Sequence, residues 1–279
     1  SAIATNGAKV VPVECGEDHL IDPEAVEKAI ANKTKCIMPT RLNGRTANMD
    51  ALCKIADNHG LFIIEDSAQA LGSKFKEKNA GTFGLGGCLS FYPAKVLGCL
   101  GDGGIILCND KKIYEKLIMM RDHGRDIVSG DVLVWGRNSR LDNIQAAFLD
   151  LQFEHYKDVI KRRRDIAKLY NDHLCSHQNL FLPPKPEENS YNFDIYQNYE
   201  IEADNRDSLK EFLAKNGIGT LIQWGGKGVH QFHKLGFNVS LPYSEKVFNR
   251  MLLLPINMTI NDDEVSYVCD KINLFYKNN

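Results

Sequence analysis

The stretch from residue 61 to residue 109 constrains the fold more strongly than any other part of the chain. It contains three apolar runs of the kind that form strands. Asp66 follows the first run directly, and Lys95 lies in a glycine-rich turn after the second. Runs that are apolar throughout are typical of strands buried on both faces, as in a parallel sheet. We therefore expect Asp66 and Lys95 to lie at the ends of neighbouring strands. The expected strands cover residues 61–65, 87–92 and 103–109.

The residues before this stretch alternate between strand-like and helix-like patterns with short connections. A strand is expected at residues 9–14, and Asp22 followed by Pro23 is a typical helix start. A buried strand is expected at residues 36–40, and an amphipathic helix at residues 49–59 that Gly60 closes. Strands alternating with helices predict an α/β fold in which helices cover a mostly parallel sheet.

The pattern changes after about residue 140. A long helical pattern covers residues 141–175, and prolines mark an extended linker at 183–186. Residues 193–201 alternate as a strand with one solvent-exposed face, and a short strand is expected at 220–223. A capping box begins a last helix at Asn261. These elements predict a small α+β domain. The expected division is a large domain at residues 1–140, then the connecting helix and small C-terminal domain at 141–279.

Composition excludes several classes of function. A net charge of -2 gives no global field for nucleic acid or an anionic membrane. No apolar run reaches the roughly 18 residues of a membrane span. The eight cysteines form no CxxC pair, so no metal site is predicted, and their place in apolar runs favours a reducing, cytoplasmic compartment.

Four side chains around the strand ends suggest pyridoxal phosphate chemistry. Asp66 can keep a pyridine nitrogen protonated, and Lys95, in apolar surroundings, is a candidate Schiff-base amine. Gln69, three residues after Asp66, can reach the phenolic oxygen of the ring, and the Ser90 hydroxyl can hold the phosphate. Taken one at a time, Asp66 can equally cap the following turn, Gln69 can be a solvated residue at a helix start, Ser90 a core serine, and Lys95 a surface lysine.

Longer motifs support this interpretation. EDSAQALGS, GTFGLGGCLSFYPAK and GDGGIILCND follow one another, with PEAVEKAIANKTKCIMP and NMDALCKIADNHG upstream and RDHGR, WGRNSRLDNIQAA and LLLPINMTINDDEV downstream. Together they resemble the sugar aminotransferases of the DegT/DnrJ/EryC1/StrS family over essentially the whole chain. The resemblance implies an aspartate-aminotransferase-like large domain with a mostly parallel sheet and a small C-terminal α+β domain.

The resemblance also implies roles for single residues. Lys95 carries the cofactor covalently, Asp66 pairs with the pyridine nitrogen, Gln69 touches the 3-hydroxyl side of the ring, and Ser90 holds the phosphate. Asn138 matches the asparagine that reaches the phosphate from a partner subunit, which implies a homodimer with a shared active site. His123 and Arg125 match a turn near the substrate, although a polar helix end is an equal interpretation of that turn.

The sequence departs from the family pattern in three places. Residues 41–44, RLNG, stand where many members have an HLYG-like segment. A loop with Trp224, Lys227 and His230 stands where many members have a tyrosine-proline loop beside the sugar, so these side chains either contact a nucleotide diphosphate or pack the loop. The resemblance further implies a preceding N-terminal segment with a Gly-Thr pair and a stacking aromatic, so we expect the chain to be N-terminally truncated.

The resulting hypothesis is a pyridoxal-phosphate aminotransferase that moves an amino group, from a donor such as glutamate, to a nucleotide-linked keto sugar in amino-sugar biosynthesis. Two alternatives stay open. One is a non-catalytic fragment or pseudo-enzyme with a binding or regulatory role. The other is a related sugar dehydratase, which Lys95 disfavours because such relatives have histidine at that position.

Overall fold

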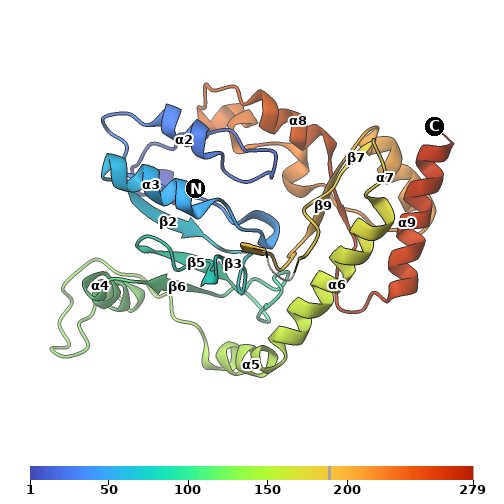
Figure 1. Ribbon diagram of the computed structural model, residues 1–279. Helices are drawn as coiled ribbons and strands as arrows, with labels where there is room; N and C mark the ends of the chain where they lie inside the picture. The colour runs from blue at the N-terminus through green and yellow to red at the C-terminus, as the bar shows by residue number, and fades with distance from the viewer. Residues whose placement is uncertain (188–189, 279) are drawn as a thin grey trace. The chain divides into compact units, whose positions relative to one another are not determined.

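The computed structural model describes residues 1–187 and 190–278. The chain forms two compact units (Figure 1). The sheet unit comprises residues 35–160 and 191–195, and the terminal unit comprises residues 1–34, 161–190 and 196–279. These units do not follow the boundary expected after residue 140, because residues 1–34 contact the C-terminal part of the chain. The division into domains stays a prediction, and its residues 188, 189 and 279 lie outside the described part.

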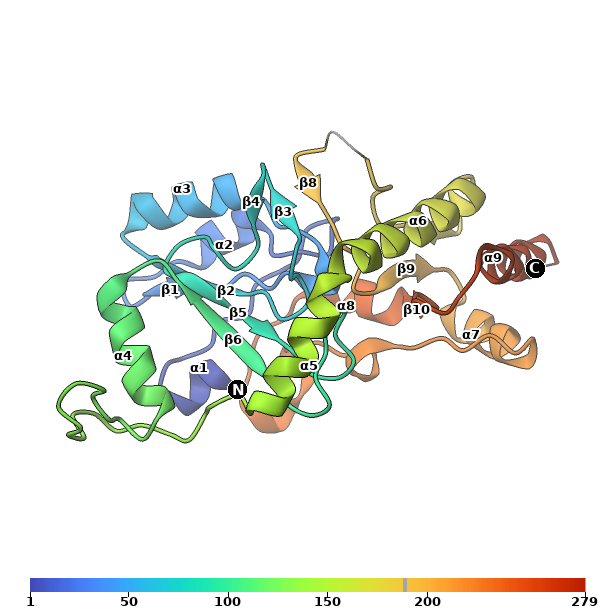
Figure 2. The same cartoon turned by 90° about the horizontal axis from the view of Figure 1, so that it is seen from below.

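A four-stranded sheet organises the sheet unit, with the strand order β1-β2-β5-β6. β1 is parallel to β2 and β2 is parallel to β5, whereas β6 is antiparallel to β5. Figure 2 shows the four strands side by side, with α4 next to β6. The predicted α/β fold with a mostly parallel sheet is thus confirmed. The strands are β1 (Cys36–Ile37), β2 (Phe62–Asp66), β5 (Gly86–Ser90) and β6 (Gly104–Cys108).

The helix α3 (Met49–His59) packs against β1 and β2 through an apolar face that includes Leu52 and Ile55. Asn48 accepts a hydrogen bond from the backbone N–H of Ala51 at its start, and Gly60 adopts the left-handed conformation at its end, as predicted. The unit also contains α4 (Lys111–Arg121), α5 (Asn143–Glu154), the 3₁₀ turn η1 (Leu42–Gly44), and a small sheet of β3 (Lys74–Phe75), β4 (Lys78–Asn79) and β8 (Asn192–Phe193).

The long helix expected at residues 141–175 is interrupted. α5 ends at Glu154, His155 has non-helical dihedrals, and α6 (Tyr156–Leu174) follows. The buried Tyr156 donates a hydrogen bond of 2.8 Å to the carbonyl of Leu71. This contact fixes the start of α6 to the sheet unit, a tertiary constraint that the helical pattern of the sequence does not contain.

The terminal unit contains an antiparallel sheet of order β10-β9-β7 and a separate apolar core. α7 and α9 pack against each other beside this sheet (Figure 1). The capping box predicted at Asn261 is present, since the Asn261 and Glu264 side chains each bond the other's backbone N–H. The elements are α1 (Ala2–Thr5), α2 (Pro23–Ala29), β7 (Leu180–Phe181), β9 (Tyr199–Ala203), α7 (Arg206–Lys215), η2 (Gln223–Gly226), η3 (Val229–Gln231), η4 (His233–Leu235), α8 (Pro242–Arg250), β10 (Met251–Leu254) and α9 (Asp262–Lys277).

Three strand predictions are wrong. Residues 9–14 form no strand, and in residues 220–223 only Leu221 forms an isolated bridge, to Leu253. Residues 193–201 divide between β8 and β9, and every residue of β9 is buried instead of showing one wet face. The reason lies outside the local sequence: the acidic side chains on the expected wet face of β9 bind His19 inside the unit.

Within residues 1–187 and 190–278, none of the helices has both the length and the apolar character needed to cross a membrane. All eight cysteines are free thiols.

Candidate active site

The carboxyl ends of β2 and β5 bring the predicted chemical groups together. Asp66 is the last residue of β2 and lies opposite Cys88 of β5. Ser90 is the last residue of β5, and Lys95 lies in the turn that follows. Burial lowers the pKa of the half-buried Lys95, and the charge of Asp66 acts in the opposite direction on the same amine. The two side chains therefore share one edge of the sheet, which is where ligands bind in open α/β sheets.

The turn that carries Lys95 is compact and anchored at both ends. The backbone N–H of Lys95 donates to the carbonyl of Tyr92 at 2.8 Å, and that of Cys99 donates to Phe91 at 2.7 Å. Leu97 and Cys99 are buried in an apolar cluster together with Leu149 of α5. Since the residues on its C-terminal side are packed in this way, the position of the Lys95 backbone is fixed by the fold.

Gly98 closes this turn because no side chain fits at its position. A Cβ atom there would lie 2.8 Å from the carbonyl oxygen of Pro93 and 2.9 Å from that of Tyr92. Both contacts are with backbone, so no side chain can move aside. Gly98 thus serves close packing of the turn.

Ser90 has a hydroxyl that suits an anion. Its oxygen accepts a hydrogen bond of 3.2 Å from the backbone N–H of Tyr92. Accepting this bond uses a lone pair, so the hydroxyl hydrogen can still be donated to a phosphate oxygen.

Gln69 is held in one orientation by the turn after β1. Its side-chain carbonyl accepts a hydrogen bond of 2.6 Å from the backbone N–H of Asn43. Because a backbone N–H can only donate, the oxygen of the amide faces Asn43 and the NH₂ group faces elsewhere. Gln69 therefore presents a donor, which is the group that a phenolic oxygen requires.

The predicted residues after α4 lie together in one exposed loop. His123 has a φ of 60°, and its backbone N–H donates to Arg137 at 2.9 Å. Arg125 forms an isolated bridge with Val132, and Asn138 forms one with Asp122. The Asn138 side chain is exposed and accepts from Arg140 at 3.1 Å. The structure joins these residues to one another, and their roles at a cofactor stay predictions.

The loop predicted to border the sugar lies in the terminal unit, and its three residues differ in exposure. Trp224 is 70% exposed and has a φ of 53°, and Lys227 is also exposed. His230 is buried, and its Nε2 lies 3.0 Å from Oε1 of Glu245. His230 therefore has a packing role of the kind that the alternative interpretation expects, whereas Trp224 and Lys227 are available at the surface.

One pair of charged residues near the site was not recognised from the sequence. Arg41 and Glu65 are both completely buried, and Nη2 of Arg41 lies 2.6 Å from Oε2 of Glu65. Glu65 directly precedes Asp66. The sequence contains one signal for this pair: Glu65 is a charged residue at the end of an apolar strand, and a buried charge requires a partner.

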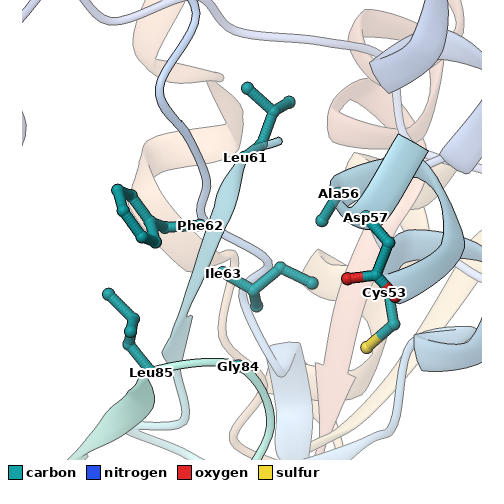
Figure 3. A pocket seen from close by; sticks show the side chains of 8 residues that line it. All are labelled: Cys53, Ala56, Asp57, Leu61, Phe62, Ile63, Gly84 and Leu85. Atoms are coloured by element: carbon teal, nitrogen blue, oxygen red, sulfur yellow. The ribbon is translucent and has the colours of Figure 1, made fainter. Parts of the chain in front are cut away.

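A small hollow lies at the other end of the same strands (Figure 3). It has a volume of about 130 Å³ and is lined by the start of β2, the residues before β5 and the second half of α3. Its polar side chains are Asp57 and Cys53, and neither can bind a phosphate as a cation or as a strong donor. This hollow does not fit the cofactor, and it lies at the amino ends of the strands. The lining residues are Cys53, Ala56, Asp57, Leu61, Phe62, Ile63, Gly84 and Leu85.

The groups at the carboxyl ends of the strands fit pyridoxal phosphate. They comprise an amine with a lowered pKa, a carboxylate whose charge reaches that amine, a hydroxyl donor and an oriented amide donor. The cofactor has an aldehyde, a pyridine nitrogen, a phosphate and a phenolic oxygen, so each group has a matching partner. Among the described residues, no group of three or more His, Cys, Asp and Glu side chains could hold a metal ion.

Comparison with known proteins agrees with this fit. The model of the DegT/DnrJ/EryC1/StrS aminotransferase family matches residues 1–273. A pleiotropic regulatory protein of Geobacillus stearothermophilus is 38% identical over 99% of this chain and 75% of its own length. The dTDP-3-amino-3,4,6-trideoxy-alpha-D-glucose transaminase of Streptomyces venezuelae is 35% identical over 97% of this chain and 72% of its own length.

Solved structures show the same relationship. The crystal structure of S. venezuelae DesV in complex with a ketimine intermediate has a TM-score of 0.92 and 34% sequence identity, and the match covers 98% of this chain and 74% of that one. Fold and site together define a pyridoxal-phosphate-dependent aminotransferase. The chain belongs to the DegT/DnrJ/EryC1/StrS aminotransferase family.

Proposed function

We propose that this enzyme transfers an amino group from glutamate to the keto group of a nucleotide-linked sugar. The observation that carries the proposal is the half-buried Lys95, whose pKa is lowered by burial and whose charge interacts with Asp66 at the ends of β2 and β5. A lowered pKa increases the fraction of the amine that is free to act as a nucleophile at a given pH. The Streptomyces transaminase named above supports a nucleotide-linked sugar as the amino acceptor.

Each residue of the site has a part in this reaction. Lys95 would hold the cofactor before the reaction, and its Nζ would then move a proton between the α-carbon of the donor and the C4′ carbon of the cofactor. Asp66 keeps the ring nitrogen protonated. Gln69 orients the ring through its amide donor, and Ser90 donates to the phosphate. Bound pyridoxal phosphate supplies the electron sink that stabilises negative charge at the reacting carbon.

We further propose a homodimer in the cytoplasm, with Asn138 reaching the phosphate of the partner subunit. The loop that carries Asn138 supports this arrangement, because it exposes large apolar side chains. Trp135 is 98% exposed and Val128 is 96% exposed. Large apolar side chains exposed on one loop are what an interaction surface requires. His123 and Arg125 on the same loop are proposed to approach the substrate.

The nucleotide is proposed to bind at the exposed part of the loop after residue 223. Lys227 offers a cation for a diphosphate, and Trp224 offers an aromatic face on which a base can stack. His230 is included for its predicted contact, although its pairing with Glu245 gives it a structural part as well.

The test is reduction of the cofactor-loaded enzyme with borohydride, followed by peptide mass spectrometry. The cofactor should be trapped on Lys95 in the natural sequence, and the visible absorbance band should disappear in Lys95→Ala. Lys116→Ala, which changes an exposed lysine of α4, is the matched control and should retain both signals. Trapping on another lysine, or a visible band that persists in Lys95→Ala, would refute the assignment. A screen of nucleotide-linked keto sugars with glutamate then identifies the acceptor.

A binding or regulatory role is the second candidate, and the name of the Geobacillus relative favours it. It predicts that no amino donor converts the bound, unreduced cofactor to its amine form and that no keto sugar returns the amine form to the aldehyde. Conversion by glutamate, seen as the loss of the visible band with formation of 2-oxoglutarate, would exclude a purely regulatory protein.

A further inference from the structure

The buried pair of Arg41 and Glu65 has a geometry that fixes the end of β2. Nε of Arg41 donates to Oε2 of Glu65 at 2.7 Å, and Nη2 of the same guanidinium lies 2.6 Å from that oxygen. The other carboxylate oxygen, Oε1, accepts from the backbone N–H of Phe83 at 2.7 Å. Both oxygens of Glu65 are thus bound, one by Arg41 in the segment after β1 and one by Phe83 in the turn before β5.

Arg41 also holds the next residue, Asp66, through the backbone. Its N–H donates to the carbonyl of Asp66 at 2.8 Å, and the N–H of Asp66 donates to the carbonyl of Pro39 at 2.9 Å. The guanidinium carbon lies 5.3 Å from the centroid of the Phe83 ring, and Nη1 donates to the carbonyl of Ala47 at 3.4 Å. Arg41 therefore contacts the side chain of one acidic residue and the main chain of the other.

Stability alone does not account for this pair. Replacing a buried ion pair with apolar residues of similar volume is often neutral or stabilising, because two charges must be removed from water. The pair does hold the Glu65 carboxylate in one orientation, because the planar guanidinium binds in a defined plane. It also neutralises the buried Glu65, which would otherwise place an unpaired negative charge next to Asp66 in the chain.

We propose that Arg41 is a positioning residue that acts through Glu65 and the main chain of β2 to aim the Asp66 carboxylate at the pyridine nitrogen. This inference rests on the proposed role of Asp66 in the aminotransferase reaction. The contribution of Arg41 is geometric, so a lysine at this position keeps the positive charge but loses the hydrogen bond from Nε and the close approach of Nη2 to Oε2 of Glu65.

The test compares two variants with matched controls in the full chain. Arg41→Lys keeps the charge, and Arg41→Met/Glu65→Gln removes both charges while glutamine can still accept from Phe83. The control Arg162→Met/Asp262→Asn removes an ion pair of 2.6 Å in the terminal unit. Each protein is freed of cofactor and reconstituted either with pyridoxal phosphate or with its N-methyl analogue, whose ring nitrogen is permanently cationic.

Both Arg41 variants are expected to bind pyridoxal phosphate about tenfold more weakly than the natural sequence does. Their kcat with this cofactor should fall by about tenfold or more. With the N-methyl analogue, their kcat should come within about twofold of the natural sequence loaded with the same analogue, because the ring no longer needs Asp66 to stay cationic. The control pair should behave like the natural sequence with both cofactors. Equal losses with both cofactors would indicate a merely structural role and overturn the inference, as would unchanged binding and kcat in both Arg41 variants.

Asp66→Asn distinguishes the role of Asp66 from the role of Arg41. If it loses activity with pyridoxal phosphate and recovers with the analogue while the Arg41 variants lose nothing, only the positioning role of Arg41 fails. If Asp66→Asn itself loses nothing, the proposed role of Asp66 fails first, and the positioning role of Arg41 fails with it.

Discussion

Gln69 accepts a hydrogen bond of 2.6 Å from the backbone N–H of Asn43, which joins the candidate cofactor site to the turn after β1. Asn43 is buried and has a φ of 59°, a left-handed conformation that asparagine tolerates better than most residues. The bond fixes both the turn and the direction in which the Gln69 amide donates. Two substitutions at Gln69 can separate these two effects.

Gln69→Glu keeps the acceptor for Asn43 and removes the NH₂ donor, whereas Gln69→Leu removes both. We expect Gln69→Glu to leave the stability of the cofactor-free protein close to that of the natural sequence and to weaken cofactor binding. Gln69→Leu should also lower the free energy of unfolding by about 1–3 kcal/mol, because a buried N–H loses its partner. Urea unfolding and cofactor titration measure the two quantities. Equal destabilisation by the two variants would contradict this separation.

The steric fit of Gly98 gives a second prediction. Gly98→Ala pushes a Cβ against two backbone carbonyls at 2.8 and 2.9 Å, so the Lys95 turn must shift. Gly101→Ala lies in the same loop and meets only the side-chain nitrogen of Gln145, at 3.4 Å. We expect Gly98→Ala to cost about 1–3 kcal/mol of stability and to slow covalent capture of the cofactor by Lys95, whereas Gly101→Ala should do neither. Comparable effects from both substitutions would show that close packing is not the reason for Gly98.

The charge of Asp66 gives a third prediction, on the reactivity of Lys95. Burial lowers the pKa of Lys95, and Asp66 raises it. Asp66→Asn should therefore lower this pKa further and increase the fraction of free amine at a given pH. In the cofactor-free protein, the pH at which Lys95 is half-acylated by an amine-directed reagent should fall, as followed by mass spectrometry. Asp57→Asn, at the opposite end of the strands, is the control, and a midpoint unchanged or raised in Asp66→Asn would contradict the pairing.

The His19 cluster gives a fourth prediction, on stability against pH. His19 Nδ1 lies 3.0 Å from Glu200 and Nε2 lies 3.0 Å from Glu202. Burial disfavours the charged imidazole, but the two carboxylates outweigh it and raise the pKa of His19 to about 9. Because the pKa in the folded state exceeds the ordinary value of 6.5, the stabilisation is fully present below pH 6.5 and is lost as the pH rises through about 9. Its size is on the order of 3 kcal/mol.

Unfolding by urea at pH 6.5, 8 and 10 measures this dependence. The natural sequence should lose stability over this range, and His19→Gln should be less stable at pH 6.5 and lose much less on going to pH 10. His177→Gln is the matched control, because His177 bonds the neutral side chain of Asn273 at 2.6 Å. A His19→Gln protein with the same pH dependence as the natural sequence would show that another group is responsible.

The sequence predicted the elements whose patterns are local. The apolar face and the C-cap of α3, the capping box of α9 and the strands β2, β5 and β6 all follow from residues adjacent in the chain, and the structure confirms them. The prediction of a solvent-exposed face for residues 193–201 was wrong, because Glu200 and Glu202 bind His19, some 180 residues earlier in the chain. In a sequence, alternating acidic residues predict a solvent-exposed face, because a cationic partner far away in the chain cannot be recognised from the local pattern.

The sequence by itself determined that a carboxylate and a lysine follow consecutive strands of a parallel sheet, since apolar runs and turns are encoded locally. It also supplied the hydroxyl of Ser90 and the amide of Gln69. Only the tertiary structure decided how these groups are held. The pairing of Arg41 with Glu65, the bond from Asn43 to Gln69 and the fit of Gly98 depend on contacts between separate elements. Such contacts arise when the strands are brought side by side, so their geometry cannot be read from the order of residues along the chain.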